Sequence, residues 1–262
     1  MEILLIFIFF MLGCVMGSFL NVVIERTKRR ENFFLKRSHC DRCKKELGFW
    51  DLIPLFSFIF LKGKCRYCGK KIAAQHFWVE LATGFVFALV YISVGTLHAT
   101  SLQINIINIY QLIFNIIIAS FLIIIFIYDL KYYLILDKFS LPAMAVVLGG
   151  NLLLGRELGD LCLGALIGGG LFLFQYVISR GKWVGGGDIR LGLLMGLVLG
   201  WKLVLVALFI AYLTGAIFGL ILIAGKKKKM KDPMPFGTFL SASTLVALLY
   251  GKIILDWYLN WF

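Results

Sequence analysis

Charged residues are scarce in this sequence. Only 16% of its 262 residues are Asp, Glu, Lys or Arg, whereas 61% are hydrophobic and the mean hydropathy is +0.91. A soluble domain of this length needs much less apolar surface to fill its core. The composition excludes an ordinary soluble protein and predicts that lipid surrounds most of the chain.

Acidic residues are the scarcer charged class, with 14 Asp and Glu against 27 Lys and Arg. In a membrane protein such an excess indicates orientation first, because Lys and Arg accumulate in the loops on the cytoplasmic side. We therefore expect the lipid bilayer as the main partner, and no nucleic acid. The first apolar run also lacks a basic segment before it and a small-residue cleavage site after it, so we expect a retained helix and no secretory signal peptide.

Apolar windows that are long enough, or nearly long enough, to cross a bilayer recur along the whole chain. They cover residues 2–24, 76–95, 105–128, 139–154, 158–178, 189–200, 202–224 and 237–258. The pattern predicts an all-α polytopic membrane protein with about eight transmembrane helices. The fourth and sixth windows are short for a crossing of about 20 residues, so we expect these helices to be tilted, buried among neighbours or merged with the next helix.

The basic residues alternate with these windows. When successive loops are assigned to opposite faces of the membrane, 24 of the 27 Lys and Arg fall on one face, and 14 of them lie between residues 25 and 75. The asymmetry predicts that this large loop is cytoplasmic. We divide the chain into a first transmembrane helix at 1–24, a cytoplasmic loop domain at 25–75 and a transmembrane core at 76–262.

Five acidic residues lie in or beside the apolar windows, where a charge costs several kcal/mol and is a functional candidate by default: Glu2, Glu80, Asp129, Asp188 and Asp256. Glu2 and Asp256 lie near the outer ends of terminal helices, where solvation explains them. Asp129 and Asp188 are both expected at the cytoplasmic boundary, and three glycines directly precede Asp188. We expect these two side chains to meet in the fold.

Two facing carboxylates that share one proton provide a general base and a general acid together. The ionised group activates a water, and the protonated group polarises a scissile carbonyl. Asp129 and Asp188 are thus predicted to be a catalytic pair for peptide hydrolysis, in which the preceding glycines let the backbone approach a substrate closely. The structural alternative is that the two aspartates cap helices or pair with Lys131 and Arg190.

Four of the six cysteines form two C-x-x-C pairs in the basic loop, and 21 residues separate the pairs: Cys40, Cys43, Cys65 and Cys68. The spacing is close to that of tetrahedral Cys₄ zinc sites. The alternatives are redox cycling of one pair or an iron–sulfur cluster. A zinc bound by four cysteines would be structural, because no coordination position remains open for a substrate.

These motifs together resemble the type IV prepilin peptidases, which belong to the GxGD class of membrane aspartyl proteases. The resemblance covers nearly the whole chain and rests on GSFLNVVI at 17–24 followed by Arg26, the paired cysteines with Ile53-Pro54-Leu55 between them, Glu80, Asp129-Leu130, Gly185-Gly186-Gly187-Asp188, and Pro235-Phe236-Gly237.

The resemblance implies a bacterial cytoplasmic-membrane enzyme with Asp129 and Asp188 as its catalytic pair. It further implies prepilin or pseudopilin substrates, cleavage after a glycine that ends a basic leader, and methylation of the new N-terminal amine with S-adenosylmethionine as donor. Gly63-Lys64 resembles a pair that the family associates with methyl transfer. The alternative for Lys64 is one more cytoplasmic positive charge.

One departure from the family pattern is visible after the first aspartate. The family usually has Ile-Pro-Asp where this chain has Ile135-Leu136-Asp137. Losing the proline removes a preference for starting a helix but no chemical group. We interpret Asp137 as a cap or interface residue.

Two other functions compete with peptide hydrolysis. A transporter or metal-handling protein would use the aspartates to relay ions, but it requires ionisable groups near the middle of several helices, and these centres are almost uncharged. A scaffold of a pilus or secretion assembly would need neither two boundary aspartates nor the glycine run. The sequence has no glycine-rich nucleotide motif after a strand, so the position of the methyl donor is left open.

Overall fold

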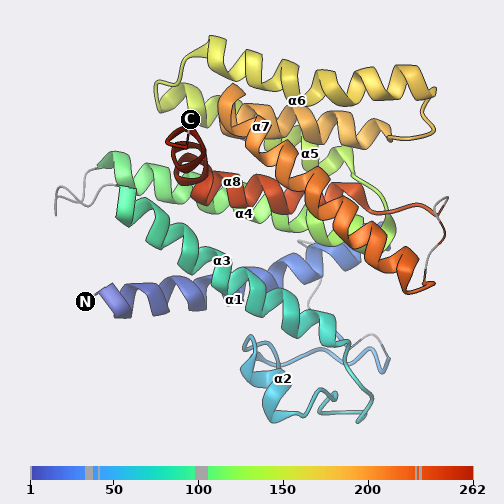
Figure 1. The fold of residues 1–262 in the computed structure, drawn as a ribbon. Helices are drawn as coiled ribbons and strands as arrows, with labels where there is room; N and C mark the ends of the chain where they lie inside the picture. The colour runs from blue at the N-terminus through green and yellow to red at the C-terminus, as the bar shows by residue number, and fades with distance from the viewer. Residues whose placement is uncertain are drawn as a thin grey trace. The chain divides into compact units, whose positions relative to one another are not determined.

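The computed structural model describes residues 2–32, 38–40, 42–97, 106–227, 229 and 232–261. Within these ranges the regular structure is helical, which confirms the predicted all-α class (Figure 1). The elements are α1 (Glu2–Lys28), a 3₁₀ turn η1 (Phe49–Asp51), α2 (Phe56–Phe60), α3 (Ala74–Leu97), α4 (Ile106–Tyr132), α5 (Asp137–Leu153), α6 (Leu158–Ser179), α7 (Gly186–Ala224) and α8 (Phe236–Leu259).

Six of the described helices are long and apolar enough to cross a membrane: α1, α3, α4, α6, α7 and α8. Helix α5 has 17 residues and is about 26 Å long at 1.5 Å per residue, which is less than the hydrocarbon thickness of about 30 Å. The fourth apolar window was expected to be short, and it is. The sixth and seventh windows both lie within α7, which has 39 residues.

Helix α7 is interrupted at Gly200, where φ is +75° and ψ is 176°. A Cβ at this position would lie 2.3 Å from Oδ2 of Asp160, so a larger residue fits neither the backbone nor the space. Figure 1 shows the two halves of α7 running in different directions. The windows at 189–200 and 202–224 are therefore the two halves of one interrupted helix.

Polar side chains from neighbouring elements bind the backbone groups that this interruption leaves without helical partners. Asn151 Nδ2 donates to Leu197 O at 2.7 Å, and Arg156 Nη1 donates to Val198 O at 3.0 Å. On the other side of the break, Trp201 N donates to a carboxylate oxygen of Asp160 at 3.2 Å. These bonds replace helical hydrogen bonds that the break removes.

The chain forms two compact units, residues 1–103 and 104–262. In the first, α1 packs against α3, and the loop that carries α2 connects them. In the second, α7 packs against α6, α8 and α5, while α4 packs against α8 and α5. The finer division at residues 24 and 75 stays a prediction.

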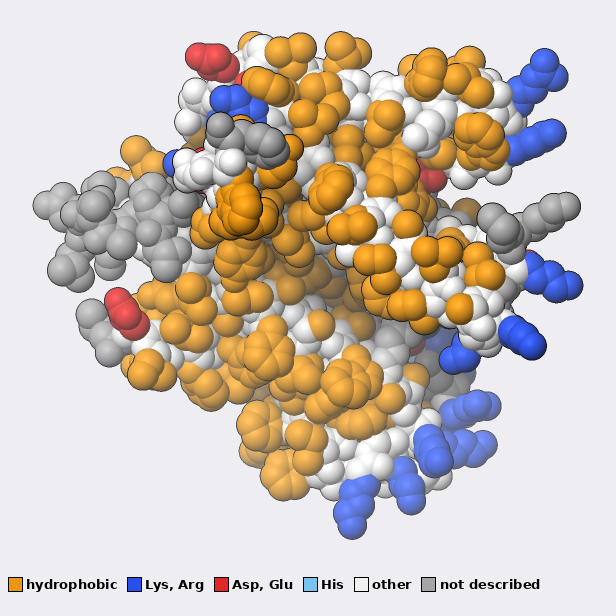
Figure 2. All heavy atoms as spheres, viewed as in Figure 1, with side chains coloured by type: hydrophobic (Ala, Val, Ile, Leu, Met, Phe, Trp, Pro, Cys, Tyr) orange, Lys and Arg blue, Asp and Glu red, His pale blue; other side chains and the backbone are white. Residues whose placement is uncertain are grey.

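Glycines hold α6 and α7 at close range, as expected for helices that associate in lipid. A Cβ at Gly164 would lie 2.6 Å from Gly196 O, and one at Gly168 would lie 2.3 Å from Gly192 O. In the space-filling view the sides of the second unit are covered by hydrophobic side chains, and several Lys and Arg side chains project at the end where α6 connects to α7 (Figure 2). This surface is that of a helical protein in a bilayer, with its basic residues at a polar boundary.

Candidate active site

Asp129 lies near the C-terminal end of α4 and is only 4% exposed. Its Oδ2 atom accepts hydrogen bonds from the backbone N–H of Thr238 at 2.7 Å and from the Thr238 hydroxyl at 3.1 Å. Thr238 belongs to the first turn of α8, where backbone N–H groups have no partner within the helix and carry partial positive charge. The start of α8 therefore binds the carboxylate of Asp129.

Asp188 lies in the first turn of α7, after the glycine run. Its Oδ2 accepts a hydrogen bond from Gly185 N at 3.0 Å, and its own N–H donates to Gly185 O at 3.1 Å. These two bonds fix the side chain at the helix N-terminus. Ile135 lies against Gly187, next to Asp188, and against Gly237, where a Cβ would also meet Asp129 Oδ2, so the fold brings together two aspartates that are 59 residues apart in sequence.

Ile135 occupies the space beside both aspartates and is contacted by two glycines. A Cβ at Gly187 would lie 2.8 Å from Ile135 Cβ. A Cβ at Gly237 would lie 2.7 Å from Ile135 Cδ1 and 3.0 Å from Asp129 Oδ2. Neither glycine can gain a side chain unless Ile135 moves, so the connection between α4 and α5 fixes the spacing of this site.

From the sequence, the structural alternatives for the two aspartates are helix capping, which the hydrogen bond from Gly185 N to Asp188 at the start of α7 shows, and salt bridges to Lys131 and Arg190. Arg190 instead pairs with Asp137 in the first turn of α5. Asp137 is therefore an interface residue that connects α5 to α7, as interpreted from the sequence. Leu136, which stands where the family usually has proline, is extended with φ −88° and ψ 134°, so α5 starts at the expected place without the proline.

Thr238 was not singled out from the sequence as part of the site. The motif at 235–237 pointed to its neighbourhood, but nothing in the pattern indicated that the next residue binds Asp129. Tyr212 of α7 was also missed. Its ring lies 5.2 Å from that of Phe236 at the start of α8, measured between centroids, and its hydroxyl accepts a hydrogen bond from Gln175 Nε2 at 2.7 Å.

The four cysteines of the two C-x-x-C pairs lie together, as predicted. Their sulfur atoms are all within 4.8 Å of one another, and the sulfurs of Cys40 and Cys68 are 4.0 Å apart. A tetrahedral zinc with Zn–S distances of about 2.3 Å holds its sulfurs about 3.8 Å apart. The donor set and its spacing therefore fit zinc.

Each C-x-x-C pair lies on the same kind of turn. The N–H of Cys40 donates to Lys45 O, and the carbonyl of Cys40 accepts a hydrogen bond from Lys44 N. In the second pair the N–H of Cys65 donates to Lys70 O, and the carbonyl of Cys65 accepts from Gly69 N. The fifth residue of each turn has positive φ, 59° at Lys44 and 67° at Gly69. Two turns with the same geometry direct their thiols to one centre.

The thiols do not ionise alike. The N–H of Cys43 and other nearby donors lower the pKa of Cys40 to about 7. Although the N–H of Lys70 lowers the pKa of Cys68, desolvation and hydrogen bonds with the neighbouring thiols raise it to about 11. Cys40 therefore loses its proton more readily than Cys68.

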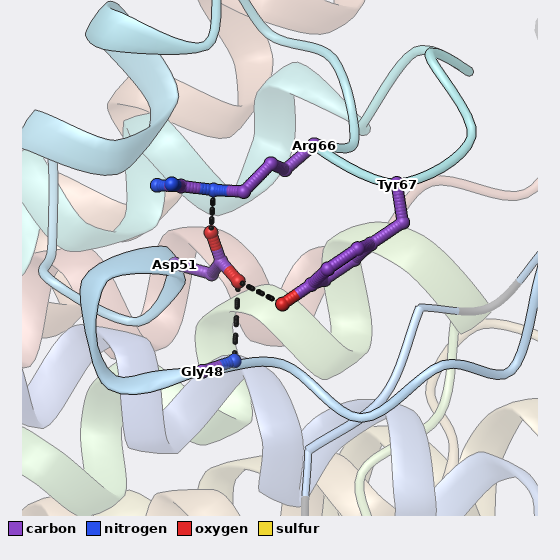
Figure 3. A network of polar contacts seen from close by, with 4 residues as sticks. All are labelled: Gly48, Asp51, Arg66 and Tyr67. Atoms are coloured by element: carbon purple, nitrogen blue, oxygen red, sulfur yellow. Dashed lines mark hydrogen bonds and ion pairs between the residues drawn. The ribbon is translucent and has the colours of Figure 1, made fainter.

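Asp51 connects the segment between the cysteine pairs to the second pair (Figure 3). Its carboxylate accepts hydrogen bonds from Arg66 Nε at 2.6 Å, from the hydroxyl of Tyr67 at 3.2 Å and from Gly48 N at 3.1 Å. Desolvation, followed by the negative charge of Asp51, raises the pKa of Tyr67, so the phenol keeps the proton that it donates. Arg66 and Tyr67 lie inside the second C-x-x-C pair, so this network orients Cys65 and Cys68.

The backbone conformation and the surroundings of Gly63 both favour glycine at this position. Its φ is +67°, and a Cβ would lie 3.0 Å from the ring of Phe58. Lys64 is exposed. A role of either residue in methyl transfer stays a prediction.

The fold and the two sites define a class: a polytopic helical membrane protein with an interacting aspartate pair at helix ends and a separate Cys₄ cluster. Residues 11–94 match the model of the bacterial peptidase A24 N-terminal domain, and residues 116–220 match that of the type IV leader peptidase family.

Three relatives are each named prepilin leader peptidase/N-methyltransferase. The chain is 33% identical to the one from Bacillus subtilis (strain 168) over 97% of both chains. It is 31% identical to the one from Aeromonas salmonicida (strain A449), over 96% of this chain and 92% of the relative, and 30% identical to the one from Legionella pneumophila, over 90% and 80%. No solved structure matches the chain. The chain belongs to the type IV leader peptidase family.

Proposed function

We propose that this protein is a membrane aspartyl endopeptidase that cleaves the basic leader from type IV prepilins or pseudopilins and N-methylates the residue exposed by cleavage. The observation that carries the proposal is the pairing of Asp129 and Asp188. The two carboxylates come from the ends of different helices, interact electrostatically, and are each held by a backbone N–H. Family membership supports both the reaction and the class of substrate.

The pair performs hydrolysis as one unit. Two carboxylates at short range are not both ionised without a large electrostatic cost, so they share one proton. The ionised carboxylate takes a proton from water, whose oxygen attacks the scissile carbonyl carbon while the protonated carboxyl donates to the carbonyl oxygen. When the C–N bond breaks, the leaving amine takes up a proton. Thr238 and Gly185 hold the two carboxylates in place through this sequence.

The substrate has to reach a site at the ends of membrane helices. A prepilin joins a basic leader to an apolar helix, so its cleavage site lies at the membrane boundary when the helix is in the bilayer. The charge asymmetry of the loops supports a cytoplasmic location of that boundary in the bacterial plasma membrane. The basic leader would then stay on the side where it was synthesised.

The four-cysteine cluster would hold a structural zinc. Cys40, Cys43, Cys65 and Cys68 supply the four ligands that such a site needs, and none of its coordination positions is open for catalysis. Zinc bound there would hold the two turns together and stabilise the cytoplasmic loop.

Methylation requires a second site, since its chemistry differs from hydrolysis. The neutral N-terminal amine attacks the methyl carbon of S-adenosylmethionine, the C–S bond breaks with its electrons going to sulfur, and the secondary ammonium that forms releases a proton to water. This reaction needs two aligned substrates and no carboxylate pair. The first unit, whose loop is rich in polar groups, supports this role.

A transporter and a scaffold remain the competing functions. A transport pathway requires ionisable groups through the depth of the helices, whereas Asp129 and Asp188 lie at helix ends. A scaffold has no need for two aspartates brought together at helix ends.

The experiment that tests the proposal uses the purified full chain in detergent or lipid with a peptide that contains a basic leader, a glycine, a phenylalanine and an apolar helix. Mass spectrometry should detect two fragments cut after the glycine and, with S-adenosylmethionine present, a gain of one methyl group on the phenylalanine amine. An intact peptide after long incubation with folded protein would contradict the proposed cleavage.

A further inference from the structure

The first unit contains a cavity of about 380 Å³ between the C-terminal half of α1, the cysteine loop and the start of α3. This volume lies in the range of about 300–1,000 Å³ that is usual for small-molecule sites. The cavity borders the cysteine cluster, since Cys40 and Cys65 are among its lining residues. Zinc and aspartyl hydrolysis do not account for such a cavity.

The inner part of the cavity is polar, with a buried carboxylate, Glu80, and a buried guanidinium, Arg26, in its lining. Glu80 is 8% exposed, and its carboxylate accepts hydrogen bonds from Leu55 N at 2.8 Å and from the hydroxyl of Ser18. Asn21 is 2% exposed and donates to His76 O at 3.2 Å, while its Oδ1 atom is buried and has no hydrogen-bond partner among the described residues. Because Asn21 Oδ1 is fully buried, a ligand that brings an N–H group reaches this acceptor only when the Asn21 side chain turns toward the cavity.

The outer part of the cavity is basic. Exposed basic side chains line it, among them Arg29, Arg42 and Lys71. A ligand that fits both parts carries a cationic group at one end and a carboxylate at the other. The amino-acid portion of S-adenosylmethionine has this arrangement, with its ammonium and sulfonium charges and its carboxylate.

An aromatic pair completes the lining. Phe58 of α2 and Phe77 of α3 both face the cavity, with ring centroids 5.4 Å apart and ring planes inclined by 33°. Aromatic faces bind a flat purine through stacking. Gly63 lies behind this pair, because a Cβ there would press on the ring of Phe58. The glycine is thus connected to the cavity through Phe58, although neither Gly63 nor Lys64 lines it.

We propose that this cavity binds S-adenosylmethionine, with Glu80 and Asn21 facing its cationic groups and with Phe58 and Phe77 contacting its adenine. The inference rests on the proposed methyl transfer and specifies which residues hold the donor. It assigns Gly63 a positioning role, through the ring of Phe58.

The test is a direct measurement of binding. Equilibrium dialysis of radiolabelled S-adenosylmethionine against the purified full chain should give a dissociation constant that rises at least about tenfold in Glu80→Gln and in Phe58→Ala, since each loses a charged or stacking contact. Glu80→Gln keeps an acceptor for Leu55 N–H and so preserves the packing. Matched controls are Glu46→Gln and Phe60→Ala, which alter the same loop and the same short helix but do not line the cavity.

Folding and location are checked separately. Each variant should keep the zinc content and leader-peptide cleavage of the parent chain within about twofold, which shows that a loss of binding is local. A photoreactive azido-adenine analogue of S-adenosylmethionine should also attach to the parent chain at the peptides that contain Phe58 or Phe77.

Unchanged affinity in both cavity variants, equal loss of affinity in the controls, or attachment of the analogue only outside residues 18–80 would overturn the inference. So would a parent chain that binds no S-adenosylmethionine. Each of these results leaves the cleavage reaction standing, whereas an uncleaved peptide would argue against the proposed peptidase and not against the cavity.

Discussion

The two units of this chain hold their polar groups in different ways. In the second unit, residues 104–262, the two aspartates are fixed by backbone N–H groups at helix ends, through Thr238 and Gly185. In the first unit, residues 1–103, Asp51 also accepts a backbone N–H, from Gly48, but the side chains of Arg66 and Tyr67 add two further hydrogen bonds to its carboxylate.

This difference follows from the surroundings of the two sites. Helix ends at a membrane boundary offer free backbone donors at fixed positions, and they need no flexible side chain to hold a charge. The loop that carries the cysteines has little regular structure within its described residues, so hydrogen bonds and the proposed zinc would stabilise its shape. We therefore expect cleavage to depend mainly on the second unit and methyl transfer to depend on the first.

The strongest test of this division between the two units is to remove one carboxylate of the pair. Asp129→Asn and Asp188→Asn should each lower cleavage by about 10³-fold or more, because an amide cannot supply the ionised half of the pair. Zinc content and binding of S-adenosylmethionine should not change. Fragment yields measured by mass spectrometry test this, with Asp256→Asn, an exposed acid of α8, as the control. Substantial cleavage by either single variant would refute the pair.

The next largest effect is expected at Gly237. A methyl group there meets Ile135 Cδ1 and Asp129 Oδ2, so Gly237→Ala should displace the carboxylate and lower kcat by about 10- to 100-fold. Adding Ile135→Val, which opens space beside the new methyl, should restore part of the rate. Gly149→Ala is the matched control, because nothing lies within 4 Å of its Cβ. If Gly237→Ala cleaves normally, the contact with Ile135 does not set the geometry of the site.

Removing a metal ligand should lower the activity of the first unit much more than that of the second. The purified chain is expected to contain about one zinc, and Cys65→Ser should lose it, because three thiolates and a hydroxyl bind zinc far less tightly. Methylation and protein yield should fall strongly, whereas cleavage by the surviving protein should fall less than about tenfold. Metal analysis and the two product assays measure these effects. Iron with sulfide in the purified protein, or full activity without metal, would contradict the zinc assignment.

The smallest effect is expected at the glycine–lysine pair. Gly63→Ala places a side chain at φ +67°, which costs about 1–2 kcal/mol locally, and presses on Phe58. Methylation should fall several-fold with cleavage unchanged. Lys64→Ala, an exposed neighbour, separates a specific role of the lysine from the conformational role of the glycine. Equal loss of cleavage and methylation in Gly63→Ala, or loss of neither, would remove the proposed link to methyl transfer.

The sequence by itself determined the helical membrane class, the apolar windows, the cysteine cluster and the candidate aspartates. These features depend on local composition and spacing. A long apolar run needs lipid, and two C-x-x-C pairs at this separation supply four metal ligands whatever surrounds them.

Only the tertiary structure decided which partners these residues have. Thr238 binds Asp129 across 109 positions of sequence, Ile135 lies against two glycines from different helices, and Arg190 pairs with Asp137 instead of an aspartate of the pair. The cavity with Asn21, Phe58 and Glu80 is likewise formed by three separate segments. No local pattern encodes such contacts, because they depend on how helices pack and on which backbone donors are left free at their ends.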